Sequence, residues 1–208
     1  VTVNPTPATP VATSNSPLCE GEAIELSTDA VAGATYSWTG PNGFTSSDQN
    51  PILTGAAPTA SGNYCVIITV DGCPSLEGCV DVTVNPTPAT PVATSNSPLC
   101  EGEAIELSTD AVAGATYSWT GPNGFTSSDQ NPILTGAAPT ASGNYCVIIT
   151  VDGCDSPQGC IDVTVNPTPS TPVATSNSPI CEGEAIELST DAVAGATYSW
   201  TGPNGFTS

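Results

Sequence analysis

Residues 64–84 read YCVIITVDGCPSLEGCVDVTV, and this stretch decides the fold. On both sides of Asp71-Gly72, apolar residues alternate with residues of other kinds, which is the pattern of half-buried β-strands. An Asp-Gly pair between two strands predicts a tight hairpin, because both positions tolerate a positive φ. We therefore expect strands at 64–70 and 79–84, with side chains alternating between a core face and an outer face.

The same period of two recurs upstream, in AIELST at 23–28 and in ATYSWT at 34–39. Turn sequences separate these segments, with GPNG at 40–43 and ASGN at 60–63. Several short strands with such punctuation are typical of an antiparallel β-sandwich. The predicted fold class is therefore all-β, and no helix is expected inside the repeating unit.

The chain repeats itself, because its opening, VTVNPTPATPVATSNSP, returns at Val82 and, with Ser170 in place of alanine, at Val163. A fixed period of 81 residues predicts a tandem array. The first two copies differ at Pro74/Asp155, Leu76/Pro157, Glu77/Gln158 and Val80/Ile161. We expect the end of a preceding repeat at 1–3, full repeats at 4–84 and 85–165, and a partial repeat at 166–208. The chain is expected to be a window on a longer array.

Four phrases of the repeat carry a resemblance: CEGEAIEL, YSWTGPNGF, SGNYCV and DGC. They resemble the immunoglobulin-like and polycystic-kidney-disease-type repeats of secreted Bacteroidota surface proteins. The resemblance implies that Trp38 lies on strand C and holds the core, with Tyr36 on the same face, and that Tyr64 begins strand F. It also implies that Thr28 occupies the place of the strand-B cysteine of antibody domains, so an antibody-type disulfide is not expected.

The charge of the chain restricts its partners. There is no Lys, Arg or His, and 20 Asp and Glu give a formal charge of −20. Nothing could neutralise the phosphates of a nucleic acid or the lipids of an anionic membrane, so neither partner is expected. No apolar run is long enough for membrane insertion. The charge favours solubility and mutual repulsion; divalent cations are the other partner it suggests, although a calcium-loop spacing is missing.

Enzymatic activity is not expected, and neither is a cofactor or a metal site. The chain has no histidine or lysine to serve as a base, and its cysteines are expected to pair. Glu20 and Glu22 form a carboxylate pair, but alternate residues near a strand start are typical of a solvated face.

The nine cysteines predict a disulfide framework and an oxidising compartment, so the protein is expected to be secreted or on the cell surface. If Asp71-Gly72 is the turn, Cys65 lies within one bulge of Cys79 on the outer face of the hairpin. This register predicts the disulfides Cys65–Cys79 and Cys146–Cys160. The competing pairing is Cys73–Cys79, which closes a short loop.

Cys19 and Cys73, with their equivalents Cys100 and Cys154, have three candidate pairings. In a sandwich of immunoglobulin topology, the start of strand B and the F–G turn lie at opposite ends, about 20–30 Å apart. Disulfide Cα atoms lie within about 7 Å. A bond between consecutive repeats, from Cys19 to Cys154, avoids this distance. Intramodule Cys19–Cys73 and Cys19–Cys65 bonds are the alternatives, and the sequence leaves all three open.

The segment NPTPATP is a semi-rigid spacer between modules, because each proline holds its predecessor extended. Its composition is similar to that of O-glycosylated stalks, so the spacer is either an unmodified linker, which is the first interpretation, or a carrier of covalent glycans on its threonines, which is the alternative. The candidate glycan carriers are Thr6, Thr9, Thr13, Thr87, Thr90, Thr94, Thr168, Thr171 and Thr175.

Two function classes follow from these features. The first is the structural shaft of an extracellular filament or cell-surface stalk, whose partners are copies of itself or further repeats of the same chain. The second is an adhesin, in which loops such as GPNGF bind a carbohydrate or a protein. Near-identical repeats, a restricted spacer and few exposed aromatic residues favour the shaft.

Overall fold

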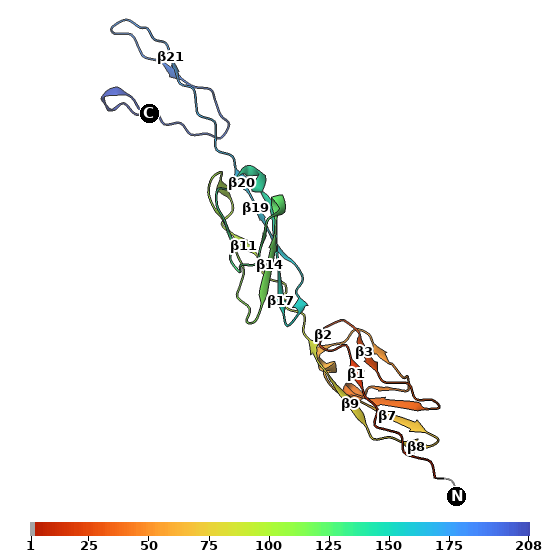
Figure 1. Cartoon of the computed structure of the whole chain (residues 1–208). Helices are drawn as coiled ribbons and strands as arrows, with labels where there is room; N and C mark the ends of the chain where they lie inside the picture. The colour runs from red at the N-terminus through yellow and green to blue at the C-terminus, as the bar shows by residue number, and fades with distance from the viewer. Residues whose placement is uncertain (1–2) are drawn as a thin grey trace. The chain divides into compact units, whose positions relative to one another are not determined.

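The structure is a computed structural model that describes residues 3–208 (Figure 1). The chain forms two compact units, of which the first ends at Asn166 and the second is Pro167–Ser208. Its regular structure is β-strand, apart from three-residue 3₁₀ turns such as η1 (Pro41–Gly43) and η2 (Pro58–Ala60). None of the described helices is long and apolar enough to cross a membrane. The predicted all-β fold class is confirmed.

The first unit holds two β-sandwiches. In the first sandwich, one antiparallel sheet has the order β1–β3–β6, and the other has the order β5–β4–β7, with β8 and β9 both pairing with β7. A short parallel pair, β2 with β10, joins the two chain ends of the sandwich. The bounds are β1 (Thr13–Ser14), β2 (Leu18–Cys19), β3 (Ile24–Ser27), β4 (Thr35–Thr39), β5 (Thr45–Ser46), β6 (Ile52–Leu53), β7 (Gly62–Val70), β8 (Cys73–Pro74), β9 (Gly78–Val82) and β10 (Val84–Asn85).

The second sandwich repeats this arrangement, with sheet orders β11–β13–β16 and β15–β14–β17–β18, β19 pairing with β17, and the parallel pair β12–β20. Its strands are β11 (Thr94–Ser95), β12 (Leu99–Cys100), β13 (Ile105–Ser108), β14 (Thr116–Thr120), β15 (Thr126–Ser127), β16 (Ile133–Leu134), β17 (Gly143–Val151), β18 (Cys154–Asp155), β19 (Gly159–Val163) and β20 (Val165–Asn166). The repeat boundaries at 84 and 165 remain predictions, since β10 and β20 continue across them.

This strand order is that of an immunoglobulin-like sandwich. In that arrangement, strands A, B and E form one sheet and strands C, F and G form the other. Here β1, β3 and β6 supply A, B and E, while β4, β7 and β9 supply C, F and G. The strand β5 lies beside β4, in the C′ position. The unit is therefore a tandem pair of immunoglobulin-like domains.

The hairpin register follows the Asp-Gly turn. Asp71 has φ 49° and Gly72 has φ 81°, and Val70 pairs with Cys73 directly across this turn. Further along, Cys65 pairs with Cys79, so the register has shifted by one residue. The extra residue lies between β8 and β9, where the buried Ser75 exchanges hydrogen bonds with the backbone of Ile68. The predicted bulge is confirmed.

Two large aromatic side chains lie at the centre of the core. Trp38 is fully buried and donates its indole N–H to the carbonyl of Gln49, 3.3 Å away. Tyr64 donates its hydroxyl to the carbonyl of Ala60, 2.9 Å away and four residues upstream, and burial raises the pKa of its phenol. The second sandwich has the same bonds at Trp119 and Tyr145. The positions that the resemblance implied for the strand-C tryptophan and the strand-F tyrosine are those observed.

The end of the spacer belongs to the sandwich rather than to a free linker. Pro10 is buried, and its carbonyl oxygen abuts Gly78 so closely that a Cβ on Gly78 would collide with it. Ala12 packs against the hydrophobic core. The prediction of a spacer along its whole length is therefore corrected, because close packing against β9 fixes its last residues.

The second unit keeps only the local part of the repeat. It contains β21 (Thr175–Ser176), β22 (Leu188–Ser189) and the 3₁₀ turn η5 (Pro203–Gly205). Ile186 is 71% exposed and Leu188 is 44% exposed, whereas the equivalent residues of the complete sandwiches are buried. This unit therefore keeps two strands of the first half of a repeat, at the positions of β1 and β3, without a closed core.

Candidate functional site

One disulfide closes the F–G hairpin of each complete sandwich. The structure joins Cys65 to Cys79 and Cys146 to Cys160, each with a Cα–Cα distance of 4.1 Å. Each pair lies directly across β7–β9 or β17–β19, on the face opposite the buried tyrosine. Cys73 has no disulfide, so the competing Cys73–Cys79 pairing is not formed.

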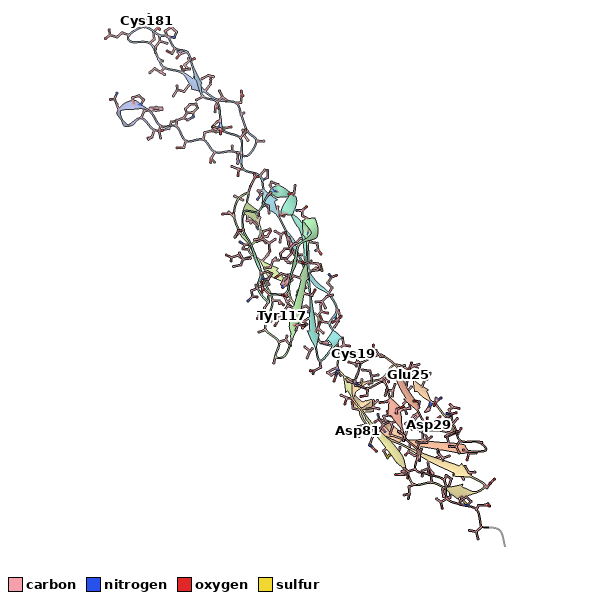
Figure 2. The ribbon with its side chains drawn as sticks, viewed as in Figure 1. Cys19, Glu25, Asp29, Asp81, Tyr117 and Cys181 are labelled. Atoms are coloured by element: carbon pink, nitrogen blue, oxygen red, sulfur yellow. A yellow bond between two sulfur atoms is a disulfide. The ribbon has the colours of Figure 1, made fainter. Side chains whose placement is uncertain are left out.

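A third disulfide connects the two sandwiches. It joins Cys19 on β2 to Cys154 in the F–G turn of the next repeat, with a Cα–Cα distance of 5.6 Å (Cys19 is labelled in Figure 2). Of the three candidate pairings, the structure forms the one between repeats. Neither intramodule bond to Cys19 is present.

Asn85 contacts both sides of this disulfide. Its carbonyl accepts a hydrogen bond of 2.8 Å from the N–H of Glu20, and its side-chain amide donates one of 3.0 Å to the carbonyl of Asp152. One residue thus fixes the end of the first sandwich and the F–G turn of the second. We call Cys19, Asn85, Asp152 and Cys154 the inter-repeat joint.

The carboxylate pair Glu20 and Glu22 serves the joint. Glu22 accepts the backbone N–H of Cys19 at 2.7 Å, and Glu20 accepts the N–H of Thr87 at 3.4 Å. These contacts give both carboxylates a structural role. The sequence did not predict this role or that of Asn85, although an Asn-Pro pair recurs at the end of β10 and of β20.

Two cysteines that the sequence assigned to disulfides are free thiols. Cys73 is half-buried and Cys100 is exposed, and neither is bonded. The expectation that both are bonded is therefore wrong, and the spacing of the observed pairing gives the reason. By the pairing of Cys19 with Cys154, the partner of Cys100 would lie 135 residues further on and that of Cys73 would precede Val1, and neither position is among the 208 residues. Cys181, in the second unit, is also free.

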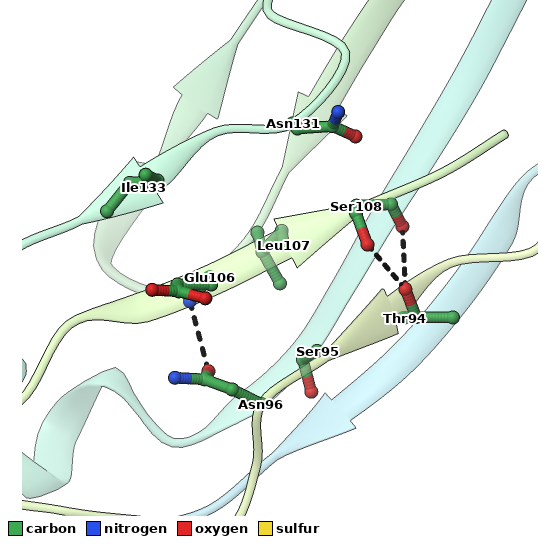
Figure 3. A pocket seen from close by; sticks show the side chains of 8 residues that line it. All are labelled: Thr94, Ser95, Asn96, Glu106, Leu107, Ser108, Asn131 and Ile133. Atoms are coloured by element: carbon green, nitrogen blue, oxygen red, sulfur yellow. Dashed lines mark hydrogen bonds between the residues drawn. The ribbon is translucent and has the colours of Figure 1, made fainter. Parts of the chain in front are cut away.

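A shallow groove lies on the outer face of β11, β13 and β16 (Figure 3). Most of the hydrogen-bonding groups that line the groove already bond to other groups of the sandwich. Thr94 bonds Ser108, with 2.6 Å between the two hydroxyl oxygens, and the side-chain oxygen of Asn96 accepts the N–H of Glu106 at 3.0 Å. The exposed Ile133 also lines the groove. The first sandwich has an equivalent groove, lined by Thr13, Ser14, Asn15, Glu25, Leu26, Ser27, Asn50 and Ile52.

One group of three metal-ligand side chains occurs among the described residues, at Cys65, Glu77 and Cys79. Two of its ligand atoms are the sulfurs of the hairpin disulfide, which leaves one carboxylate. The second repeat has Gln158 at the position of Glu77. The group is therefore a poor fit for a metal ion in the oxidised protein.

The nine candidate glycan-carrying threonines are all exposed. They fall into two kinds. Thr13, Thr94 and Thr175 place their hydroxyls 2.6–2.8 Å from a serine hydroxyl across a strand pair. Thr6, Thr9, Thr87, Thr90, Thr168 and Thr171 lie in the extended segments before those strands.

No protein-family model and no curated protein matches this chain. Solved structures with a similar fold include murine CEACAM1b, with 12% identity and a TM-score of 0.47, and a complex of the mouse coronavirus receptor-binding domain with its murine receptor, with 12% identity and a TM-score of 0.49. Each match covers 75% of this chain and 99% of the other. The human OSCAR ligand-binding domain matches with 14% identity and a TM-score of 0.34, over 76% of this chain and 99% of its own. The class of the protein rests on its strand order: it has tandem immunoglobulin-like domains stapled by disulfides.

Proposed function

We propose that this chain is a non-catalytic, load-bearing segment of an extracellular filament or cell-surface stalk. The inter-repeat joint is the observation that carries the proposal. Consecutive domains are connected twice, once through the spacer and once through Cys19–Cys154. A binding domain needs no second covalent link to its neighbour, whereas a shaft under tension gains from one.

The surface supports the same function. Glu25, Asp29 and Asp81 are exposed acidic side chains (labelled in Figure 2), and the chain has no cationic residue to pair with them. Neighbouring fibres of such chains repel one another at low ionic strength. Glycans on the exposed spacer threonines would add a steric barrier. The disulfides fit an oxidising, extracellular location, and the resemblance to Bacteroidota surface repeats supports a bacterial cell surface.

A single-molecule pulling experiment tests the load-bearing role. With Cys19–Cys154 closed, 135 residues of chain are bypassed by the disulfide. We expect the oxidised chain to extend by about 350–390 Å less than a Cys19→Ser/Cys154→Ser variant, at about 3.3–3.6 Å per residue, because the two hairpin disulfides of the variant still bypass 14 residues each. Equal extensions for the two chains would contradict the proposal. Mass spectrometry of residues 82–96 tests the glycans separately.

The second candidate function is adhesion, and the groove that recurs in both sandwiches favours it. If the grooves bind a carbohydrate, the chain should bind immobilised glycans saturably, and Ile52→Asp together with Ile133→Asp should abolish binding. No saturable binding is expected on the shaft proposal.

A further inference from the structure

The inter-repeat joint has two sides, and each side has a counterpart elsewhere in the first unit whose cysteine is not in a disulfide. We call the side with the parallel strand pair the cap face; it consists of Cys19, Glu22 and Asn85 in the first repeat and Cys100, Glu103 and Asn166 in the second. We call the other side the turn face; it consists of Asp152 and Cys154 in the second repeat and Asp71 and Cys73 in the first. One cap face and one turn face meet in the joint.

The cap face of the second repeat is built in the same way as the occupied one. The N–H of Cys100 donates to Glu103 at 2.6 Å, as that of Cys19 does to Glu22 at 2.7 Å. The N–H of Glu101 donates to the carbonyl of Asn166 at 2.8 Å, the same distance as in the occupied face. The cap face is therefore formed without its partner, and Cys100 is exposed on it.

The turn face of the first repeat is formed as well. Asn4 donates its side-chain amide to the carbonyl of Asp71 at 3.3 Å, as Asn85 does to Asp152 at 3.0 Å. The thiol of Cys73 lies 3.8 Å from the carbonyl oxygen of Asn4. The segment that would arrive from a preceding cap face already occupies its place on this repeat.

We propose that both free faces are covalent docking sites for other repeats of this same sequence: Cys100 for the F–G-turn cysteine of one repeat, and Cys73 for the cap-face cysteine of another. The bond forms by thiol–disulfide exchange with a small-molecule disulfide. The two cysteine thiols lose two protons and two electrons and form one S–S bond, and the small disulfide takes them up as two thiols.

The spacing of this bond has a topological consequence. Cys19 and Cys154 are 135 residues apart, whereas the repeat period is 81 residues. Loops closed at every boundary therefore overlap, since the loop that starts at Cys100 begins 54 residues before the first one ends. Each peptide bond of the array then lies inside at least one closed loop. A single backbone cut would leave the array covalently continuous, whether the array is a shaft or an adhesin stalk.

The chain offers a clean way to cut it, because it has no Lys or Arg and so no site for trypsin. Val11→Arg and Val92→Arg each introduce one site at equivalent positions, where the native side chains are both 67% exposed. Each variant is oxidised with glutathione disulfide, and its free thiols are alkylated. It is then unfolded in urea and digested with trypsin while its disulfides remain intact. After the cut in Val92→Arg, the two pieces should stay together until reduction; after the cut in Val11→Arg, they should separate at once. Separation of the Val92→Arg pieces would overturn the proposal.

A third trypsin site and a longer chain test whether Cys100 on the free cap face bonds to a further repeat. Val173→Arg places a cut beyond Cys154, so the 208-residue chain should release its C-terminal piece. In an extended chain, a copy of residues 128–165 follows Ser208 and completes the third repeat with its own F–G turn. There the piece should remain attached until reduction, and Cys100→Ser should release it. Release from the extended chain with Cys100 intact would overturn the proposal, and this outcome leaves the load-bearing role to be judged by the pulling experiment.

Discussion

Residues 163–208 and residues 1–46 have nearly the same sequence but different environments. Ile24 and Leu26 are 0% and 2% exposed, whereas their counterparts Ile186 and Leu188 are 71% and 44% exposed. The local hydrogen bonds persist: Asn177 bonds Ala185 and Glu187 as Asn15 bonds Ala23 and Glu25. Residues 167–208 contain no counterpart of β6, β7, β8, β9 or β10. Local sequence therefore forms the A–B turn, whereas the later strands, the long F–G hairpin among them, close the core.

The largest expected effect is that of removing the tryptophan that the hairpin covers. Trp38→Ala should destabilise the first sandwich by about 3–5 kcal/mol, because it empties a fully buried site. Trp200→Ala should change stability by less than about 0.5 kcal/mol, because no F–G hairpin covers this residue. Guanidinium unfolding followed by circular dichroism measures both. Equal effects would show that the two copies share one environment.

The second-largest expected effect is that of removing the hairpin disulfide. Cys65→Ser/Cys79→Ser opens a link across a separation of 14 residues and should cost about 3 kcal/mol through the entropy of the unfolded chain. The first sandwich should then move toward the state of the second unit, with faster hydrogen exchange in β3. The matched variant Cys146→Ser/Cys160→Ser should have the same effect on β13 and leave β3 unchanged. Unchanged exchange in both would assign the closure of the core to other contacts.

A smaller effect, of opposite sign, is expected at Thr28. Its hydroxyl is buried and has no hydrogen-bond partner among the described residues. Thr28→Val should stabilise the first sandwich by about 1 kcal/mol, because it removes an unsatisfied polar group with little change of shape. Thr190, at the equivalent position of the second unit, also has a buried hydroxyl without a partner among the described residues, but its side chain is only half-buried, so Thr190→Val should stabilise by less. A loss of stability in Thr28→Val would indicate that a water molecule satisfies the hydroxyl.

The sequence predicted the fold well because its signals were local. The period of two and the Asp71-Gly72 turn predicted the hairpin, its bulge and the placing of Cys65 across from Cys79. The pairing of Cys19 could not be chosen from sequence, because it depends on how two domains meet. Asn85 was missed for the same reason: its two hydrogen bonds go to different domains.

The last expected effect is seen at alkaline pH, and it distinguishes the two closed sandwiches from residues 167–208, which form no closed core. Burial raises the pKa of Tyr64 and Tyr145 above the ordinary value near 10, whereas residues 167–208 contain no counterpart of either.

A buried phenol keeps its proton in the folded state at a pH where the unfolded chain has lost it. Its contribution to stability is therefore fully present below pH about 10 and is lost as the pH rises through the raised pKa. Absorbance at alkaline pH should show two of the five tyrosines ionising late, together with unfolding of the sandwiches. The Tyr64→Phe/Tyr145→Phe variant should lose this late phase, at a cost of about 1 kcal/mol per domain at neutral pH for the missing bonds to Ala60 and Ala141. If all five tyrosines ionise together in the native chain, the two cores are as open to solvent as the second unit.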